Sequence, residues 1–294
     1  MTSQIIRGTE VSRPTPDRVT SSVLDHATVT ENSKFGYRNN EGMWVSYNCL
    51  DLLTPTATCP APQVGYKTFS RAEWQPAFEF AVHGGVECSA VGLDKEDQAA
   101  EIKRVFERSE GKGVEQALLY TRFEAPDSDS GYTWDAPVDL TPSGGISLVV
   151  ALAILEGDAA ANYAGLPTIH MPRAAATVLQ SHGLITWKGD KAYTSNGSKV
   201  AIGGGYDDPT ALASGAWTLF ATGEIHVEKS EQIDHQMYVI PGDGSGEGSD
   251  ENGLADNTVI ALVERMYRVT VDCYLAKATG NAGGAAGASG GFGD

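Results

Sequence analysis

The sequence lacks the features that mark several large classes of protein. Its 294 residues contain no apolar run close to the roughly 20 residues of a membrane-spanning helix. The first four residues (Met-Thr-Ser-Gln) do not resemble the basic start and apolar middle of a signal peptide, so we expect no secretion signal. We therefore predict a soluble globular chain with no membrane partner.

Cysteine is scarce, and its spacing indicates neither a disulfide framework nor a metal centre. The four residues Cys49, Cys59, Cys88 and Cys273 are scattered, with no C-x-x-C pair. Without a secretion signal, we interpret them as free thiols, mostly in or near the core. Cys88 together with a histidine such as His83 lacks a second ligand pair at zinc spacing. We predict no metal and no cofactor.

Basic residues are also few. The chain has 21 Lys and Arg against 38 Asp and Glu, a net charge of −17. Proteins that bind duplex DNA need clustered cations to displace counterions from the phosphates, and this sequence has no such cluster. Residues 123–256 hold 19 acidic and 5 basic side chains, a net charge of −14, so most of the acidity lies there. Sequence-specific nucleic-acid binding is therefore excluded.

Catalytic motifs are missing as well. The six histidines show no H-E-x-x-H or H-x-x-x-H spacing. His170, on a short apolar strand, is the best single candidate, but a buried histidine bonded by the backbone is the favoured interpretation. The run Gly203-Gly204-Gly205 precedes acidic residues at 207 and 208, which favours a turn over a phosphate cradle. We predict that the chain is not an enzyme.

The residues that are present predict an α+β chain rich in loops. Apolar residues make up 41%, enough for a buried core, while 34 glycines and 13 prolines supply many turns. Apolar residues alternate from Phe78 to Val82 and predict a half-buried strand that continues past Gly84. Helical spacing then predicts one long helix over 94–120, with Gly111 and Gly113 marking a bend.

The rest of the chain divides into shorter elements. Residues 1–40 are expected to form an extended arm without packed elements, and 280–294 a glycine-rich tail too flexible to pack alone. Asn196-Gly197 is typical of a tight hairpin turn. We expect helices and strands over these ranges: helices 146–163 and 173–181; strands 168–171, 184–187, 192–194, 199–202, 217–221, 225–228, 259–265 and 267–276.

This order of parts resembles the major capsid proteins of tailed bacteriophages, which have the HK97-like fold, and is similar to those of phages infecting actinobacteria. The likeness covers about residues 40–278, and the ordered set of segments carries it. Those segments are 78–82, 86–89, 94–120, 151–155, 162–173, 197–206, 219–223, 262–267 and 271–273.

The resemblance implies a division of the chain into the parts of that fold. It implies an N-terminal arm (1–40), an E-loop (41–77), a P-domain with a long spine helix (78–123 and 256–280), an A-domain (124–255) and a flexible tail (281–294). An arm and a two-stranded loop cannot bury their own apolar side chains, so aromatic residues there are expected at subunit interfaces. These interface candidates are Trp44, Tyr47, Tyr66, Phe69 and Trp74.

The function implied is assembly. Such subunits form hexamers and pentamers of an icosahedral head around double-stranded DNA, in a virion assembled in the host bacterial cytoplasm. Scaffolding, portal and decoration proteins are further candidate partners. The acidic 123–256 region is expected to enclose DNA without binding it tightly. Three alternatives stay open: an encapsulin-type nanocompartment shell, a phage tail or decoration protein, and a hydrolase that uses His170.

Overall fold

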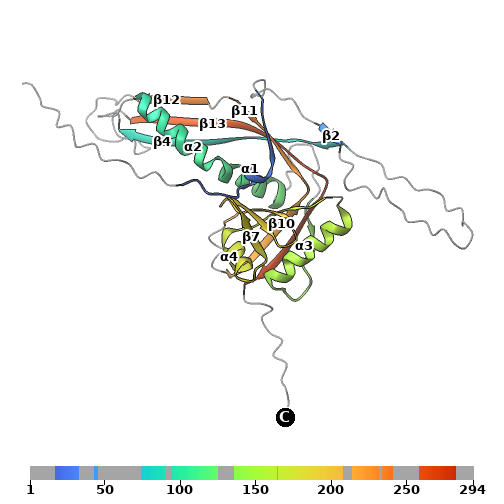
Figure 1. The fold of residues 1–294 in the computed structure, drawn as a ribbon. Helices are drawn as coiled ribbons and strands as arrows, with labels where there is room; N and C mark the ends of the chain where they lie inside the picture. The colour runs from blue at the N-terminus through green and yellow to red at the C-terminus, as the bar shows by residue number, and fades with distance from the viewer. Residues whose placement is uncertain are drawn as a thin grey trace, which may run out of the picture.

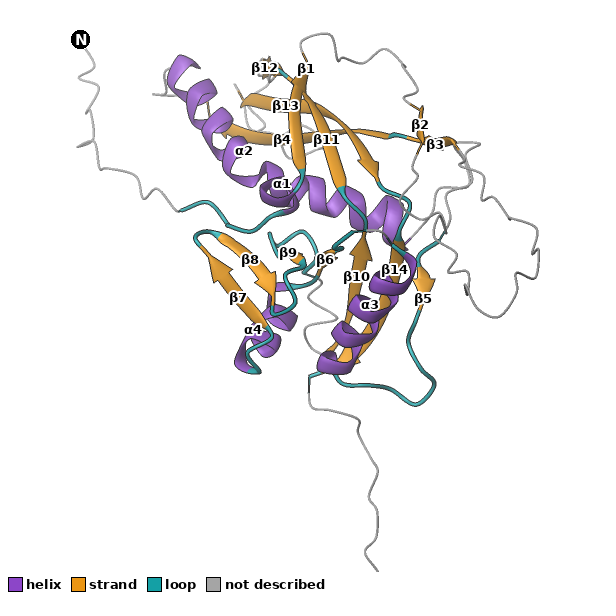
Figure 2. Ribbon diagram, turned by 45° about the vertical axis from the view of Figure 1, so that its right-hand side comes forward, coloured by secondary structure: helices purple, strands orange, loops and turns teal. Residues whose placement is uncertain are grey.

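The computed structural model describes residues 17–32, 43–45, 74–89, 95–124, 136–163, 165–207, 214–231, 234–240 and 258–282. These residues form two large β-sheets, each with its own helices, and a two-stranded sheet of β2 and β3; the two large sheets meet near the C-terminal end of a long helix (Figures 1 and 2). No helix in this part of the chain has the length and apolarity needed to cross a bilayer.

Four α-helices and one π-helical turn are described: α1 (Val23–His26), α2 (Lys95–Leu118), η1 (Leu119–Glu124), α3 (Leu148–Asn162) and α4 (Arg173–Ser181). The first eight strands are β1 (Thr28–Asn32), β2 (Met43–Val45), β3 (Trp74–Pro76), β4 (Phe78–Ser89), β5 (Val138–Asp139), β6 (Thr168–His170), β7 (Ile185–Lys188) and β8 (Lys191–Thr194). The remaining strands are β9 (Lys199–Ala201), β10 (Ala216–Thr222), β11 (Ile225–Ser230), β12 (Asp234–Ile240), β13 (Thr258–Val271) and β14 (Leu275–Asn281).

The first sheet has five strands arranged around β13. One edge of β13 pairs with β4 over twelve positions, and the other pairs with β12 and then β11. β1 adds to β11 in parallel. The spine helix α2 lies along this sheet (Figure 1) and packs Phe106 and Val114 toward it. The sheet and the helix thus form two layers with an apolar core between them.

The second sheet has seven strands in the order β5-β14-β10-β6-β9-β8-β7. Helix α3 covers β14 and β10, and α4 packs near β7 (Figure 2). The core between them is rich in alanine and leucine, with Leu148, Leu155 and Leu179 almost fully buried. The β8–β9 turn at Asn196-Gly197 confirms the predicted hairpin, with Gly197 at a φ of 97°.

The predicted long helix is confirmed, with a different ending. The α-helix stops at Leu118, and one π-helical turn carries the chain on to Glu124. The two internal glycines are explained by close packing. A Cβ on Gly111 would lie 2.8 Å from the Ser22 hydroxyl oxygen, and one on Gly113 would overlap Val82. Glycine is therefore needed where the N-terminal segment and β4 touch the helix.

The predicted strand pair at 259–265 and 267–276 is wrong. β13 runs unbroken through residue 266, and β14 begins at Leu275 in the other sheet. The reason is an uninterrupted period of two along β13, in which alternate side chains from Ala261 to Val269 are buried. β14, which the predicted division placed in the P-domain, pairs with β10.

The expectation that residues 1–40 hold no packed element is wrong for residues 21–32. These form α1 and β1, and Val23 is fully buried. Hydrophobic periodicity does not reveal β1, because four of its five residues are exposed. The strand is held by its backbone pairing to β11. β12 was also missing from the expected strands.

One cysteine expectation is also wrong. Cys273, in the turn between β13 and β14, is disulfide-bonded rather than a free thiol. Disulfide pairing depends on residues that approach one another only in the folded chain, so the scattered spacing of the cysteines did not indicate it.

Candidate functional site at the spine helix

A buried carboxylate on the spine helix joins three parts of the chain. The Glu115 side chain is fully buried. Its Oε1 accepts hydrogen bonds from the backbone N–H of Val23 at 2.9 Å and of Gly203 at 3.0 Å, and its Oε2 accepts one from Gly205 at 2.9 Å. One side chain therefore links the N-terminal segment, α2 and the loop after β9.

The electrostatics of Glu115 are unusual. Burial raises its pKa to about 7, although the hydrogen bonds from Gly205, Val23 and Gly203 act in the opposite direction. The nearby Asp25 carboxylate adds to the rise. Among the described residues no salt bridge reaches Glu115, so its charge is met only by neutral N–H groups. A buried anion of this kind is costly to ionise.

The glycine run at 203–205 forms the predicted turn, and its backbone N–H groups donate hydrogen bonds to the Glu115 carboxylate. A Cβ on Gly203 would lie 2.6 Å from Glu115 Oε2, and one on Gly205 would lie 2.6 Å from the Lys112 carbonyl oxygen. Gly204 has a φ of 96°. Successive N–H groups that converge on one anion form the kind of concave site that elsewhere binds phosphate. Here the Glu115 carboxylate fills it.

The N-terminal segment is bound to the second sheet by Ser21. Its hydroxyl donates to the Val200 carbonyl oxygen at 2.7 Å and accepts from the Ala192 N–H at 2.9 Å. The Ile202 N–H donates to the Ser21 carbonyl oxygen at 2.7 Å. Ser21 has a φ of 60°, in the left-handed region that non-glycine residues seldom occupy. His26 Nε2 lies 2.9 Å from the same hydroxyl.

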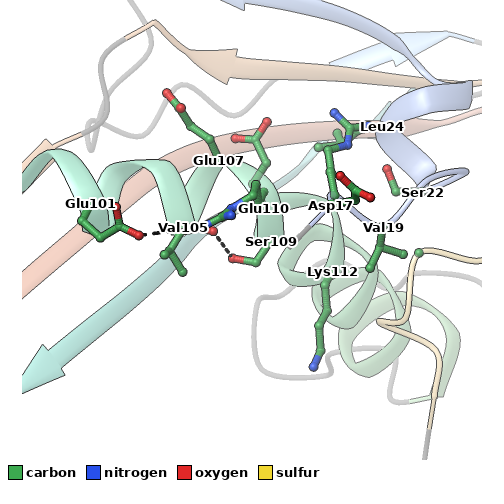
Figure 3. A pocket seen from close by; sticks show the side chains of 14 residues that line it. Asp17, Val19, Ser22, Leu24, Glu101, Val105, Glu107, Ser109, Glu110 and Lys112 are labelled. Atoms are coloured by element: carbon green, nitrogen blue, oxygen red, sulfur yellow. Dashed lines mark hydrogen bonds and ion pairs between the residues drawn. The ribbon is translucent and has the colours of Figure 1, made fainter. Parts of the chain in front are cut away.

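A groove of about 410 Å³ opens between α2 and residues 17–24 (Figure 3). Its apolar lining includes Val19 and Val105, which are 46% and 48% exposed. The acidic Glu101 on the same wall is paired with Arg104 at 2.5 Å. The groove therefore mixes apolar and mutually neutralised charged groups.

A second cluster connects α2 to the first sheet. Glu110 Oε2 accepts from Arg265 Nη1 at 2.8 Å and from the Tyr267 hydroxyl at 2.9 Å. Lys229 Nζ lies 3.6 Å from the other Glu110 oxygen and 3.3 Å from Glu31 of β1. Because the Arg265 side chain is only 8% exposed, this pair holds the helix in register on the sheet.

His170 is confirmed as a buried histidine, with side-chain rather than backbone partners. Its Nδ1 lies 2.7 Å from the Tyr206 hydroxyl oxygen, and its Nε2 lies 2.9 Å from Thr222 Oγ1. Burial lowers the pKa of the fully buried ring to about 3. Both ring nitrogens are occupied, and the Phe123 ring packs edge-on at 5.1 Å. This geometry gives His170 no access to a substrate.

The predicted interface aromatics are not tested. Tyr47, Tyr66 and Phe69 lie outside the described residues, as do the side chains of Trp44 and Trp74. The backbones of Trp44 and Trp74 lie on β2 and β3, where Val45 pairs with Trp74, so the two ends of the 46–73 segment lie side by side. Within the described part of the chain, no cluster of three or more His, Cys, Asp or Glu residues could hold a metal ion.

Glu115 was missed by the sequence analysis, although a signal exists. Gly111, Val114, Glu115 and Leu118 follow the i, i+3, i+4, i+7 spacing of one helix face. A carboxylate on that otherwise apolar face, preceded by a glycine, indicates a buried acceptor. The partner amides at 23, 203 and 205 could not be found in the same way, because any backbone N–H can serve.

No protein-family model matches this sequence, and no curated protein does. Among solved structures, the capsid of Ralstonia phage GP4 is similar with a TM-score of 0.50 and 11% identity, over 95% of this chain and 98% of that chain. Gordonia phage Cozz gives a TM-score of 0.49 at 14% identity, over 94% of this chain and 91% of that one. The capsid of an empty GTA particle gives 0.48 at 12% identity, over 96% and 94%. The likeness to the GP4 capsid, over nearly the whole of both chains, shows that this chain has the α+β HK97-like capsid fold that its sequence resembles.

Proposed function

We propose that this chain is a major capsid protein that assembles into hexamers and pentamers of an icosahedral phage head enclosing double-stranded DNA. The observation that carries the proposal is the likeness to the Ralstonia phage GP4 capsid, which covers 95% of this chain and 98% of the other. Because the likeness covers nearly the whole of both chains, it supports a role as a capsid subunit for the chain as a whole.

An open sheet edge supports assembly. The twelve-residue strand β4 pairs with β13 along one edge, and within the described residues no strand pairs with the other edge. A long unpaired edge is a site for pairing with another chain, and stable monomers usually keep such edges short or covered. The open edge of β4 is therefore suited to contact with a neighbouring subunit.

The predicted interface residues extend this proposal. Trp44, Tyr47, Tyr66, Phe69 and Trp74 belong to the 41–77 segment, which leaves the first sheet next to β4. On a shell, these aromatic side chains would lie on a neighbouring subunit. Scaffolding, portal and decoration proteins are the further partners that we propose for such a head.

The charge distribution fits a wall around DNA. The excess of acidic residues lies in 123–256, which includes most of the seven-stranded sheet. A surface of this charge repels packed DNA and so encloses it without holding it. We place the chain in the virion, with assembly in the host bacterial cytoplasm.

Electron microscopy and sedimentation of the purified full chain test the proposal. We expect capsomers or closed shells whose proportion rises with protein concentration. A compact monomer at every concentration would contradict it. Particle contents separate the alternatives: DNA supports a phage head, a protein cargo supports an encapsulin-type shell, and rings or surface knobs in place of shells support a tail or decoration protein.

A further inference from the structure

The segment at 20–27, which we call the N-terminal anchor, is held by polar contacts and by a small apolar contact. Val23 is its one buried apolar side chain, and the partly buried Leu24 and Ala27 pack against the same core. The polar attachments include the hydrogen bonds of Ser21, the bond from the Val23 N–H to Glu115, and the bond from Arg173 Nη2 to the Thr20 carbonyl oxygen. The left-handed backbone at Ser21 adds strain that these contacts outweigh in the packed state. Polar interactions therefore contribute to how firmly the anchor stays in place.

Two buried titratable side chains lie where the anchor packs: Glu115 of α2, which can be an anion, and His26 of the anchor itself, which can be a cation. Glu115 is fully buried and receives only neutral N–H groups. His26 is 6% exposed, and its Nδ1 has no hydrogen-bond partner. Burial disfavours the anion of Glu115 and the cation of His26, and at His26 it outweighs the opposing effect of the Asp25 carboxylate. Both side chains are therefore most compatible with the packed anchor when they are neutral.

We propose that Glu115 and His26 are opposed proton switches for the N-terminal anchor, so that its attachment depends less on pH than it would with either side chain alone. Release of the anchor exposes both side chains to water. An exposed carboxyl group loses its proton as the pH rises, which favours release at high pH. An exposed imidazole gains a proton as the pH falls, which favours release at low pH.

The pH ranges in which the two side chains affect release of the anchor overlap. The pKa of Glu115 is raised from 4.5 to about 7 in the packed state, so release becomes easier as the pH rises through that range. The pKa of His26 is lowered from 6.5 to about 4, mainly by burial and then by Lys191, so release becomes easier as the pH falls through that range. Because the two effects have opposite signs, each offsets part of the change in the ratio of released to attached anchor that the other alone would produce.

Other ionisable groups surround the pair. Asp25 keeps a lowered pKa, because hydrogen bonds from Arg18 and Ser22 outweigh the opposing effect of burial. Burial raises the pKa of Tyr206 far above its usual value. Further ionisable groups near the pair are those of Lys191, Lys199 and His170, and the Tyr193 ring packs edge-on against His26 at 5.6 Å. Burial lowers the pKa of His170 to about 3, so the ring stays neutral in this range.

Hydrogen exchange on the full chain tests the proposal. Protection of the Val23, Gly203 and Gly205 amides, corrected for intrinsic exchange, is compared at pH 5 and 8 with the oligomeric state checked by sedimentation. In the natural chain we expect a smaller change than in either of two variants that each keep one switch. In Glu115→Gln, protection should increase at least about 10-fold from pH 5 to 8, and in His26→Asn it should fall at least about 10-fold.

Matched controls come from exposed residues of the same types. Glu107→Gln, on the same helix, and His182→Asn, after α4, should both keep the profile of the natural chain. A natural chain whose protection changes more than that of either switch variant, or two switch variants that stay flat or shift in the same direction, would overturn the proposal.

Infrared titration of the natural chain keeps the proposal testable if Glu115→Gln does not fold. We expect one carboxyl group to titrate near pH 7, the value to which burial raises the pKa of Glu115. A chain with no protonated carboxyl above about pH 6 would overturn the proposal. The test is independent of the capsid function, since shells can form or fail to form with either exchange result.

Discussion

Glu115→Ala should destabilise the chain, and the loss should be larger at pH 5 than at pH 8. The substitution leaves the buried N–H groups of Val23, Gly203 and Gly205 without their acceptor. An unsatisfied buried N–H group costs about 1–3 kcal/mol. Three of them amount to roughly 3–9 kcal/mol, less where water enters the space left by the side chain.

The charge of Glu115 offsets part of this loss. Its pKa is raised from 4.5 to about 7, so the fold favours the protonated form, and the contribution of Glu115 to stability is greatest below about pH 4.5. That contribution declines as the pH rises to about 7, by about 2–3 kcal/mol in total between pH 5 and 8. We therefore expect Glu115→Ala to lower the free energy of unfolding by about 2–4 kcal/mol at pH 8 and by about 2 kcal/mol more at pH 5.

Urea unfolding of free subunits, followed by circular dichroism at both pH values, measures these differences. Glu107→Ala is the matched control, because Glu107 is exposed on the same helix and its removal should change stability by less than about 0.5 kcal/mol. A loss below about 1 kcal/mol at both pH values, or a larger loss at pH 8 than at pH 5, would refute the reasoning.

Four further variants test the packing and the interface. Gly113→Ala should lower the free energy of unfolding by about 1–3 kcal/mol because its Cβ overlaps β4, whereas Gly157→Ala, with open space around it in α3, should raise it by about 0.5–1 kcal/mol in the same urea titration. Glu110→Gln should lower the thermal midpoint, since it removes the charge opposite a buried arginine; an unchanged midpoint would count against the ion pair. Tyr66→Ala combined with Phe69→Ala should abolish shells in sedimentation while the circular dichroism spectrum stays unchanged, and intact shells would exclude both residues from the interface.

The sequence predicted those elements whose beginning and end are decided by residues close to them in the chain. Helix α4 runs from Arg173 to Ser181 as predicted, because Pro172 can open a helix and Gly183, at a φ of 71°, can close one. The spine helix was predicted from its apolar period, and the turn at 196–197 from its Asn-Gly pair. In each case the deciding interactions lie within a few residues of chain.

The incorrect predictions concern features that depend on residues distant in the sequence. The apparent break at residue 266 in β13 was an error because pairing with β4 along twelve positions holds the strand straight. β1 was missed because its partner, β11, lies almost 200 residues away. The disulfide of Cys273 likewise depends on folding. Local propensity is overridden wherever long-range pairing supplies the hydrogen bonds.

By itself, the sequence determined the three longer α-helices, many of the strands, the resemblance to capsid proteins and the concentration of acidity in residues 123–256. Only the tertiary structure decided that residues 20–27 pack inside, and that the amides of a glycine turn receive a carboxylate from the spine helix. The physical reason is that hydrophobic periodicity indicates which face of an element is buried. Every residue except proline has the same backbone N–H group, so the sequence does not indicate which acceptor that group will bond. The acceptor of these backbone N–H groups is decided only when segments about 90 residues apart in the chain meet at Glu115.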